Sequence, residues 1–297
     1  MNVPKEVTRL GGIHYVGHLS GRGDRLSSKG RLETGAGNAD IQLSKNGKNI
    51  QAKIATKGIA LDRILANKTF GQVATTIEVK GNKDHLVAKG EISRFDYNKY
   101  SFRNIRLDGQ YNHGIVKGLA SIDDPNIRVD IEGNYAMKGN KYAINTHIDH
   151  LQPSILGVKM ADKGYSLDDI DLSANNQSSD SYLDLEAPFM SLHARGQYNL
   201  STLVSSIQNM IAEKLPTLPG IKKTKAKGDN DFTLQGNIYS TEVLNKILGI
   251  PLAISSPIHI NGNISEQSNE LNLYLSAPLF SYNGKPFHNG NVELTTL

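Results

Sequence analysis

Apolar and polar residues alternate with a period of two along most of this chain. Residues 127–135 are the clearest case, because every odd position is apolar or glycine and every even position is polar. Successive side chains of a β-strand point to opposite faces, so the pattern predicts strands with one apolar and one polar face. A single apolar face is typical of antiparallel hairpins, whereas buried parallel strands have continuous apolar runs. We therefore expect an all-β fold built on a long, curved, mainly antiparallel sheet.

The alternation also predicts which side chains share the apolar face of that sheet. The expected set is Ile105, Leu107, Tyr111, Ile127, Val129, Ile131, Tyr135, Met190, Leu192, Tyr198, Phe232, Leu234, Ile238, Ile258, Ile260, Ile264, Leu271, Leu273 and Leu275. Members between 105 and 135 should point into one cavity or core, with Arg128 and Asp130 on the opposite face in water. Asn46-Gly47 and Asn283-Gly284 predict tight hairpin turns.

A tripeptide of glycine, a polar residue and then Tyr, Ile or Val recurs seven times. The seven glycines are Gly90, Gly109, Gly133, Gly196, Gly236, Gly262 and Gly290. Most stand on the apolar face, although glycine has no side chain to bury and weakens a strand interior. On that face a glycine lets the sheet bend or leaves space for a neighbouring aromatic ring. The alternative is that each glycine only marks the end of a strand.

Three segments depart from the strand pattern and predict helices. Residues 201–215 have apolar residues at helical spacing, with Ser201 or Thr202 as N-cap and Pro216 as the stop. Residues 241–248 end at Gly249, and residues 60–67 form a shorter candidate. Each has one apolar stripe, so each should lie flat on the apolar face or seal an edge. Such helices either cover a core or act as a gate.

Two stretches, residues 58–81 and 97–137, resemble the TamB (translocation and assembly module) proteins of Gram-negative bacteria, within the AsmA-like superfamily. The similarity is carried by a short helix followed by FGQVATTIEVKG (70–81), by the strand NIRLDGQY (104–111) and by the turn DDPNI (123–127). These are patterns of strand and turn without a catalytic signature. We expect residues 1–297 to be one continuous section of a longer chain of this type.

The resemblance implies a sheet folded lengthwise into a taco-like trough with an apolar interior that binds phospholipid acyl chains. It implies a periplasmic location, with a tether to the inner membrane through parts of the parent chain not present here. Members move phospholipid between the inner and outer membranes. With an outer-membrane partner of the Omp85 class, they also assist outer-membrane protein assembly.

Composition and charge argue against nucleic acid as a partner. The 33 basic residues exceed the 29 acidic ones by four, and the only dense basic run lies at residues 222–227. Nucleic-acid binders normally concentrate basic residues on one face or helix. The chain has no cysteine, which excludes disulfides and thiolate metal sites.

Catalytic and metal-binding constellations are not recognisable in the sequence. His14 and His18 share a strand face but lack a third ligand, while His147 and His150 are three apart and point to opposite faces. We therefore expect a protein without catalysis, cofactor or metal. Two classes stay open: a structural or adhesive β-sandwich with a closed apolar core, and a lipid conduit whose apolar face is covered by acyl chains. The resemblance favours the conduit.

Overall fold

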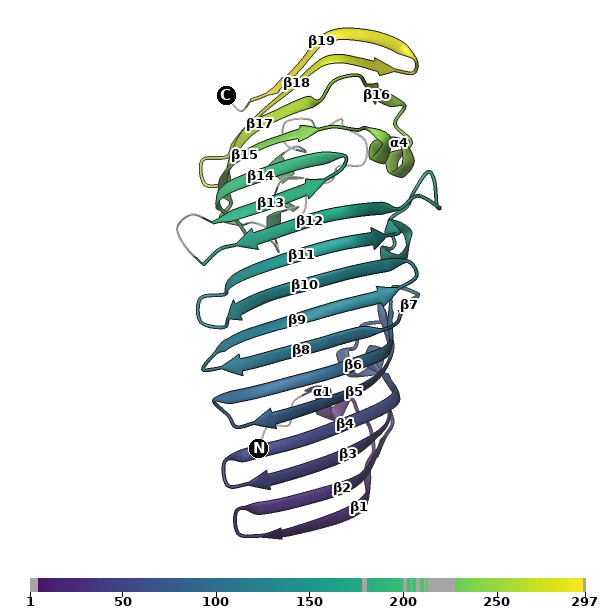
Figure 1. Ribbon diagram of the computed structural model, residues 1–297, viewed down its shortest axis with the longest axis vertical. Helices are drawn as coiled ribbons and strands as arrows, with labels where there is room; N and C mark the ends of the chain where they lie inside the picture. Colours follow the sequence, from purple (N-terminus) through teal and green to yellow (C-terminus); the bar gives the residue numbers. More distant parts are fainter. Residues whose placement is uncertain are drawn as a thin grey trace. The chain divides into compact units, whose positions relative to one another are not determined.

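The computed structural model describes residues 5–177, 181–199, 202–203, 205–206, 209–210, 212 and 228–295. Strands dominate this part of the chain and belong to one antiparallel sheet of 19 strands (Figure 1). The prediction of an all-β, antiparallel fold is therefore confirmed. The chain divides into two compact units, residues 1–140 with 148–158 and residues 141–147 with 159–297. They are described separately as the N-terminal and the C-terminal unit.

The N-terminal unit is a succession of long antiparallel strands joined mostly by tight turns. Its strands are β1 (Ile13–Arg22), β2 (Arg25–Thr34), β3 (Gly37–Asn46), β4 (Asn49–Ala60), β5 (Phe70–Gly81), β6 (His85–Tyr97), β7 (Tyr100–Phe102), β8 (Ile105–Asn112), β9 (Ile115–Asp124) and β10 (Ile127–Ala136). Each pairs with the next, except that β8 pairs directly with β6 beside the short β7. The strand β11 (Lys141–Leu151) contributes residues to both units.

The C-terminal unit has shorter strands and more helix. Its strands are β12 (Leu167–Asn175), β13 (Tyr182–Ala187), β14 (Met190–Gln197), β15 (Asp231–Ile238), β16 (Leu252–Ile254), β17 (Ile258–Ser265), β18 (Glu270–Tyr282) and β19 (Lys285–Leu294). The hairpin predicted at Asn283-Gly284 joins β18 to β19. Both loop residues have positive φ, 53° and 73°, and a two-residue hairpin of this kind favours Asn-Gly.

Helices occur at the three predicted segments. The helix α2 (Leu61–Leu65) lies within 60–67, and α4 (Glu242–Leu248) ends at Gly249 in the left-handed conformation. Described residues between 202 and 212 are also helical, and the rest of the predicted helix 201–215 lies outside the described residues. Thr202 is itself helical, so it is not the N-cap. No helix in the described part is long and apolar enough to cross a bilayer.

Helix is not confined to those three segments, and this part of the prediction is wrong. The short helix α1 (Lys5–Thr8) precedes β1, and a 3₁₀ turn, η1 (Pro153–Leu156), follows β11. Proline fixes φ near the helical value, and Gly157 ends the turn with φ 84°. Both lie where the alternation of the strands is interrupted.

A buried carboxylate fixes the turn between β9 and β10. Asp124 is almost fully buried and accepts hydrogen bonds from the Tyr100 hydroxyl and from the backbone N–H groups of Arg103, at 3.1 Å, and Asn126, at 3.0 Å. Burial and the neighbouring Asp124 raise the pKa of Tyr100, so this hydroxyl keeps its proton and donates it. The sequence Asp-Asp-Pro-Asn is therefore a structural corner.

The strands of the N-terminal unit curve, and Figure 1 shows one end of β1 to β6 turning away. Register shifts lie at that end, between Asn38 and Asp40, between Thr56 and Ile59, and in β5 at residues 70–73 and 74–75. A bulge inserts an extra residue into one strand and bends it. The recurring glycines Gly90 and Gly109 instead lie in regular ladder, so they do not coincide with these bends.

In the C-terminal unit, recurring glycines stand where a neighbouring strand or ring comes too close for a side chain. A Cβ on Gly290 would overlap the ring of Phe280, which lies over it, as the aromatic interpretation expects. A Cβ on Gly236 would overlap the backbone oxygen of Ser191 and lie 3.0 Å from Leu192 Cδ1 on the adjacent strand. Gly109 in the N-terminal unit differs, because the atom nearest to an added Cβ would be the backbone oxygen of Lys117 at 3.7 Å, which is an ordinary van der Waals contact.

We predict that Gly236→Ala destabilises the protein by about 1–3 kcal/mol, because the added methyl forces the β14 backbone to move. The matched control Gly109→Ala should be neutral or should stabilise by up to about 1 kcal/mol, because alanine fits and restricts the unfolded chain. Urea unfolding measures both. Equal effects of the two substitutions would show that close backbone approach is not what selects glycine at position 236.

Candidate functional site

One face of the N-terminal unit carries rows of apolar side chains that continue from strand to strand. Residues directly opposite each other in a ladder point to the same face. The central row runs through Gly17, Gly30, Ile41, Ile54, Ile77, Gly90, Leu107, Ala120 and Ile131. We name this surface, from β1 to β10, the apolar face.

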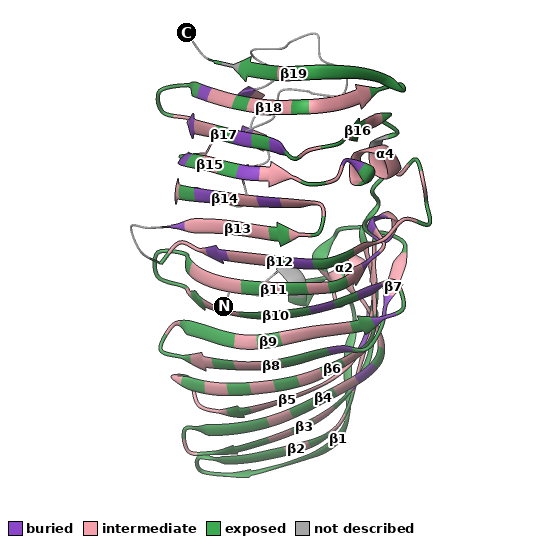
Figure 2. Cartoon of the chain, turned by 45° about the horizontal axis from the view of Figure 1, so that its top comes forward, coloured by how far each residue is buried: buried purple, intermediate pink, exposed green. Residues whose placement is uncertain are grey.

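Many large side chains of the apolar face are open to solvent. Leu19 is 65% exposed, Ile54 40%, Leu107 38% and Ile131 37%. On β6, Figure 2 shows exposed and intermediate positions in alternation, and the intermediate ones lie on the apolar face. A second sheet packed on this face would bury such side chains, as in β-sandwiches. Within the N-terminal unit the apolar face therefore has no second layer over these positions.

The structure brings the predicted residues between 105 and 135 together on this face. Ile105 and Val129 both lie opposite Ile122, Leu107 and Ile131 both lie opposite Ala120, and Tyr111 and Tyr135 both lie opposite Val116. Arg128 and Asp130 point the other way and are exposed. The predicted parity is confirmed. Burial differs within the set, because Ile105, Ile127 and Val129 are buried whereas Leu107, Ile131 and Tyr135 are exposed, so the expected cavity or core is found only in part.

The predicted residues of the C-terminal unit also share one face. Ladder pairs connect Met190 with Ile238, Ile238 with Ile258, Phe232 with Ile264, Ile264 with Leu271, Leu234 with Gly262 and Gly262 with Leu273. They also connect Leu192 with Gly236, Gly236 with Ile260 and Ile260 with Leu275. Figure 2 shows buried positions on β14, β15 and β17. The face that these residues share is more covered than the apolar face of the N-terminal unit.

Side chains of the helical residues described between 202 and 212 cover part of this second face. Met210 belongs to a buried cluster with Ala194, Tyr198, Phe232, Ile264 and Leu271, and Leu203 packs against it. Burial raises the pKa of Tyr198, whose hydroxyl donates to the backbone oxygen of Tyr182. The expectation that this helix lies on the apolar side of the sheet is confirmed for Leu203 and Met210. Tyr198, Phe232, Ile264 and Leu271 therefore lie in a closed core.

A buried polar network holds the helix in place. Asn230 and Ser206 are fully buried, and the Asn230 side-chain amide donates to Ser206 Oγ at 3.0 Å and to Glu266 Oε2 at 2.7 Å. Glu266 also accepts from the backbone N–H groups of Gly228, at 3.2 Å, and Asn230, at 2.9 Å. Partial burial acts to raise the pKa of Glu266, but these hydrogen bonds and one from Ser206 outweigh it and lower the pKa.

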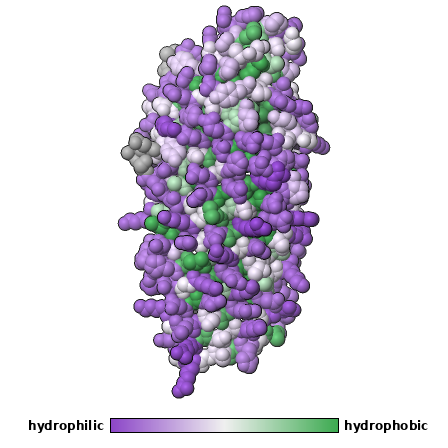
Figure 3. Space-filling model, viewed as in Figure 1, coloured by the Kyte–Doolittle hydropathy of each residue, from purple (hydrophilic) through white to green (hydrophobic). Residues whose placement is uncertain are grey.

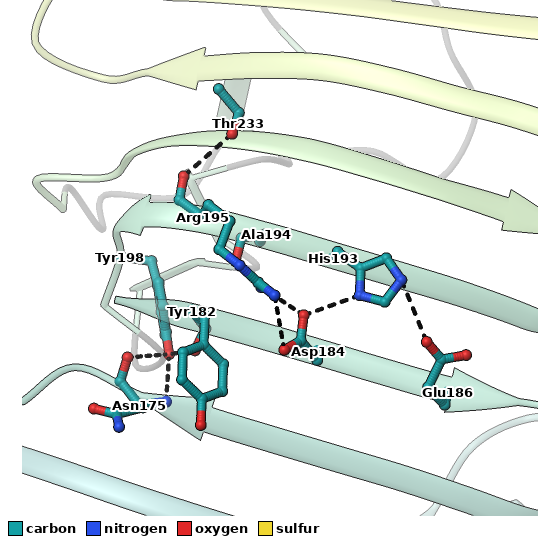
Figure 4. Close-up of polar contacts among 9 residues, drawn as sticks. All are labelled: Asn175, Tyr182, Asp184, Glu186, His193, Ala194, Arg195, Tyr198 and Thr233. Atoms are coloured by element: carbon teal, nitrogen blue, oxygen red, sulfur yellow. Dashed lines mark hydrogen bonds and ion pairs between the residues drawn. The ribbon is translucent and has the colours of Figure 1, made fainter. Parts of the chain in front are cut away.

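The opposite face of each unit is mainly polar and holds ion pairs between strands, although Val16, Val87 and Leu119 are exposed on it in the N-terminal unit. In Figure 4, Asp184 on β13 accepts hydrogen bonds from His193, at 3.0 Å, and from Arg195, at 3.1 Å for Nη2. Burial acts to raise the pKa of Asp184, but these two partners outweigh it and lower the pKa. In the N-terminal unit Lys53 pairs with Glu78 at 2.7 Å. The face seen in Figure 3 is dominated by hydrophilic side chains, with apolar ones in small groups.

Metal-binding geometry does not emerge from the described residues. No group of three or more His, Asp or Glu side chains among them is arranged to hold a metal ion. His14 lies 3.4 Å from Glu33, and His147 lies 2.8 Å from Asp171 on the neighbouring strand. These contacts are cross-strand pairs of the polar face.

The sequence prediction of the apolar face was incomplete. Leu19, Leu26 and Val116 are exposed on it and were not included, although the same alternation with a period of two would have found them. The network around Asn230 had no sequence signal, because its members are far apart in the chain and polar. Hydrogen bonding between distant segments, not local pattern, places them together.

We predict that the Glu266 network stabilises the protein at neutral pH and fails in acid. A carboxylate with a lowered folded pKa contributes stability above its unfolded pKa, about 4.5, and loses it as pH falls through the folded value. Glu266→Gln should cost about 1–3 kcal/mol at pH 7. In urea unfolding the difference between variant and parent should shrink at pH 3. A difference that is the same at both pH values would contradict the assignment.

Searches against protein-family models, curated proteins and solved structures found no match to this chain. Its function must therefore be inferred from the apolar face and from the sequence resemblance.

Proposed function

We propose that this chain is a non-catalytic section of a lipid conduit, in which phospholipid acyl chains cover the apolar face. The observation that carries the proposal is the continuous apolar face from β1 to β10, on which Leu19, Ile54 and Leu107 are exposed to solvent. Fully burying one such side chain is worth roughly 1.5–3 kcal/mol, so an uncovered row favours an apolar ligand. The free energy of aliphatic contact is non-directional and proportional to the buried area, so hydrocarbon chains can bind at any position along the face.

The exposure of individual side chains supports a single-layered sheet in the N-terminal unit. On the apolar face Leu19 is 65% exposed and Ile54 is 40% exposed. A closed β-sandwich buries both inner faces, so these exposures weigh against that alternative.

The resemblance to TamB proteins extends the proposal to the parent chain. On that basis the parent is periplasmic and tethered to the inner membrane. It moves phospholipid between the two membranes. An Omp85-class partner in the outer membrane would take part in protein assembly. These elements rest on the resemblance alone.

A photo-crosslinking amino acid on the apolar face tests the proposal in cells. We expect a probe at Ile131 to capture phospholipid, whereas a probe at the neighbouring Glu132, on the polar face, should not. Both positions are exposed, so access to solvent is matched. Mass spectrometry of the adduct identifies the lipid. Equally poor capture of lipid at both positions in the folded, functional protein would contradict the conduit and favour the β-sandwich alternative.

A charge on the apolar face should block lipid without unfolding the protein. Leu107 and Leu119 lie on adjacent strands, are both exposed, and point to opposite faces. A carboxylate among acyl chains costs several kcal/mol. We therefore expect Leu107→Asp to lower lipid binding by about tenfold or more, whereas Leu119→Asp leaves it unchanged, with similar melting temperatures. If the two variants bind lipid equally well, the apolar face is not the lipid path.

A further inference from the structure

The hairpin turns of the N-terminal unit form a continuous rim at one end of its strands. Antiparallel hairpins place residues 22–25, 45–49, 82–84, 112–115 and 136–140, which are the turns and strand-end residues beside them, at this end. Backbone hydrogen bonds join neighbouring turns, from Gly47 N to Asp24 O at 3.1 Å and from His113 N to Asp84 O at 2.9 Å. A third runs from Met137 N to Gly114 O at 2.9 Å. We name these turns the turn rim.

The turn rim is basic. Its six basic side chains are Arg22, Arg25, Lys45, Lys48, Lys83 and Lys138, against two acidic ones, Asp24 and Asp84. All six are exposed. Among the described residues only Lys83 of the six has a carboxylate partner, Asp84 at 3.6 Å. Near the opposite strand ends, Arg94 is instead held by Asp96 through two hydrogen bonds of 2.8 and 2.7 Å.

The unpaired charge borders directly on the apolar face. Lys45 lies opposite Leu26 and Ile50 in the ladder, so its side chain is on the apolar face with them. Leu26 and Ile50 are 36% and 37% exposed. A lysine in this position lays its aliphatic stem along apolar neighbours and keeps its ammonium group in water.

We propose that the turn rim binds the headgroups of anionic phospholipids while their acyl chains lie along the apolar face. This rests on the proposed function and adds the class of lipid and its orientation. From Ile50 to Ile54 the apolar face extends four residues, or about 13 Å, away from the rim along the strand. A lipid whose phosphate binds at Lys45 can therefore lay its acyl chains along Ile50 and Ile54. A net negative headgroup is held more tightly than a zwitterionic one, because basic side chains near a lipid surface each add attraction.

Binding of two short-chain lipids to the purified full chain tests this inference. The probes are dioctanoyl phosphatidylglycerol and dioctanoyl phosphatidylcholine, each below its critical micelle concentration. We expect the anionic lipid to bind about tenfold more tightly at low ionic strength, with the advantage shrinking as salt screens the rim. The double variant Lys45→Glu with Lys48→Glu should remove this advantage and change phosphatidylcholine binding less than twofold.

Lys29→Glu is a control for charge reversal away from the rim, because Lys29 is exposed in mid-strand on the polar face, opposite Gln42. It should leave both affinities unchanged. Equal affinity for the two lipids in the parent protein overturns the inference about the turn rim but remains consistent with the proposed conduit. Binding of neither lipid overturns both. Glycerol phosphate binding as tightly as phosphatidylglycerol would show an anion site without an acyl path, which also overturns the inference.

Discussion

The structure depends on the alternation of side chains along hydrogen-bonded strands. Each ladder fixes which residues stand opposite each other, so one apolar face on one strand becomes an apolar face across its neighbours. In the N-terminal unit this adds up to a continuous surface from β1 to β10. Such a surface must be covered by protein or by ligand, because apolar area in water forfeits the main favourable contribution to folding.

The two units differ in how the apolar side of their strands is covered. In the C-terminal unit Met210 and Leu203 of a helix pack onto the strands, and a polar network centred on Asn230 holds that helix. In the N-terminal unit Leu19, Ile54 and Leu107 stay open to solvent. One unit therefore completes a core with its own chain, whereas the other keeps the surface that the proposed acyl chains would occupy.

The polar face and the turn rim differ in how their charged side chains are paired. Cross-strand pairs such as Lys53 with Glu78 balance charge on the polar face. At the turn rim the basic side chains are largely unpaired, and Lys45 stands beside Leu26 and Ile50. Hydrocarbon contact alone does not orient a ligand, so the orientation of the proposed lipid would come from this charged border.

The sequence by itself determined strand identity and side-chain parity. Residues 127–135 show why, since alternation with a period of two is local and leaves Val129 and Ile131 on the same face whatever lies around them. Helix at 60–67 and 241–248 was also readable, because its spacing and Gly249 act within a few residues. Only the tertiary structure decided that Val129 is buried while Ile131 is exposed, and that Tyr198 is closed under a helix. Burial depends on which distant segments pack together, as do the bulges in β3 to β6 and the contacts of Asn230. Those interactions join residues far apart in the chain, so no local pattern encodes them.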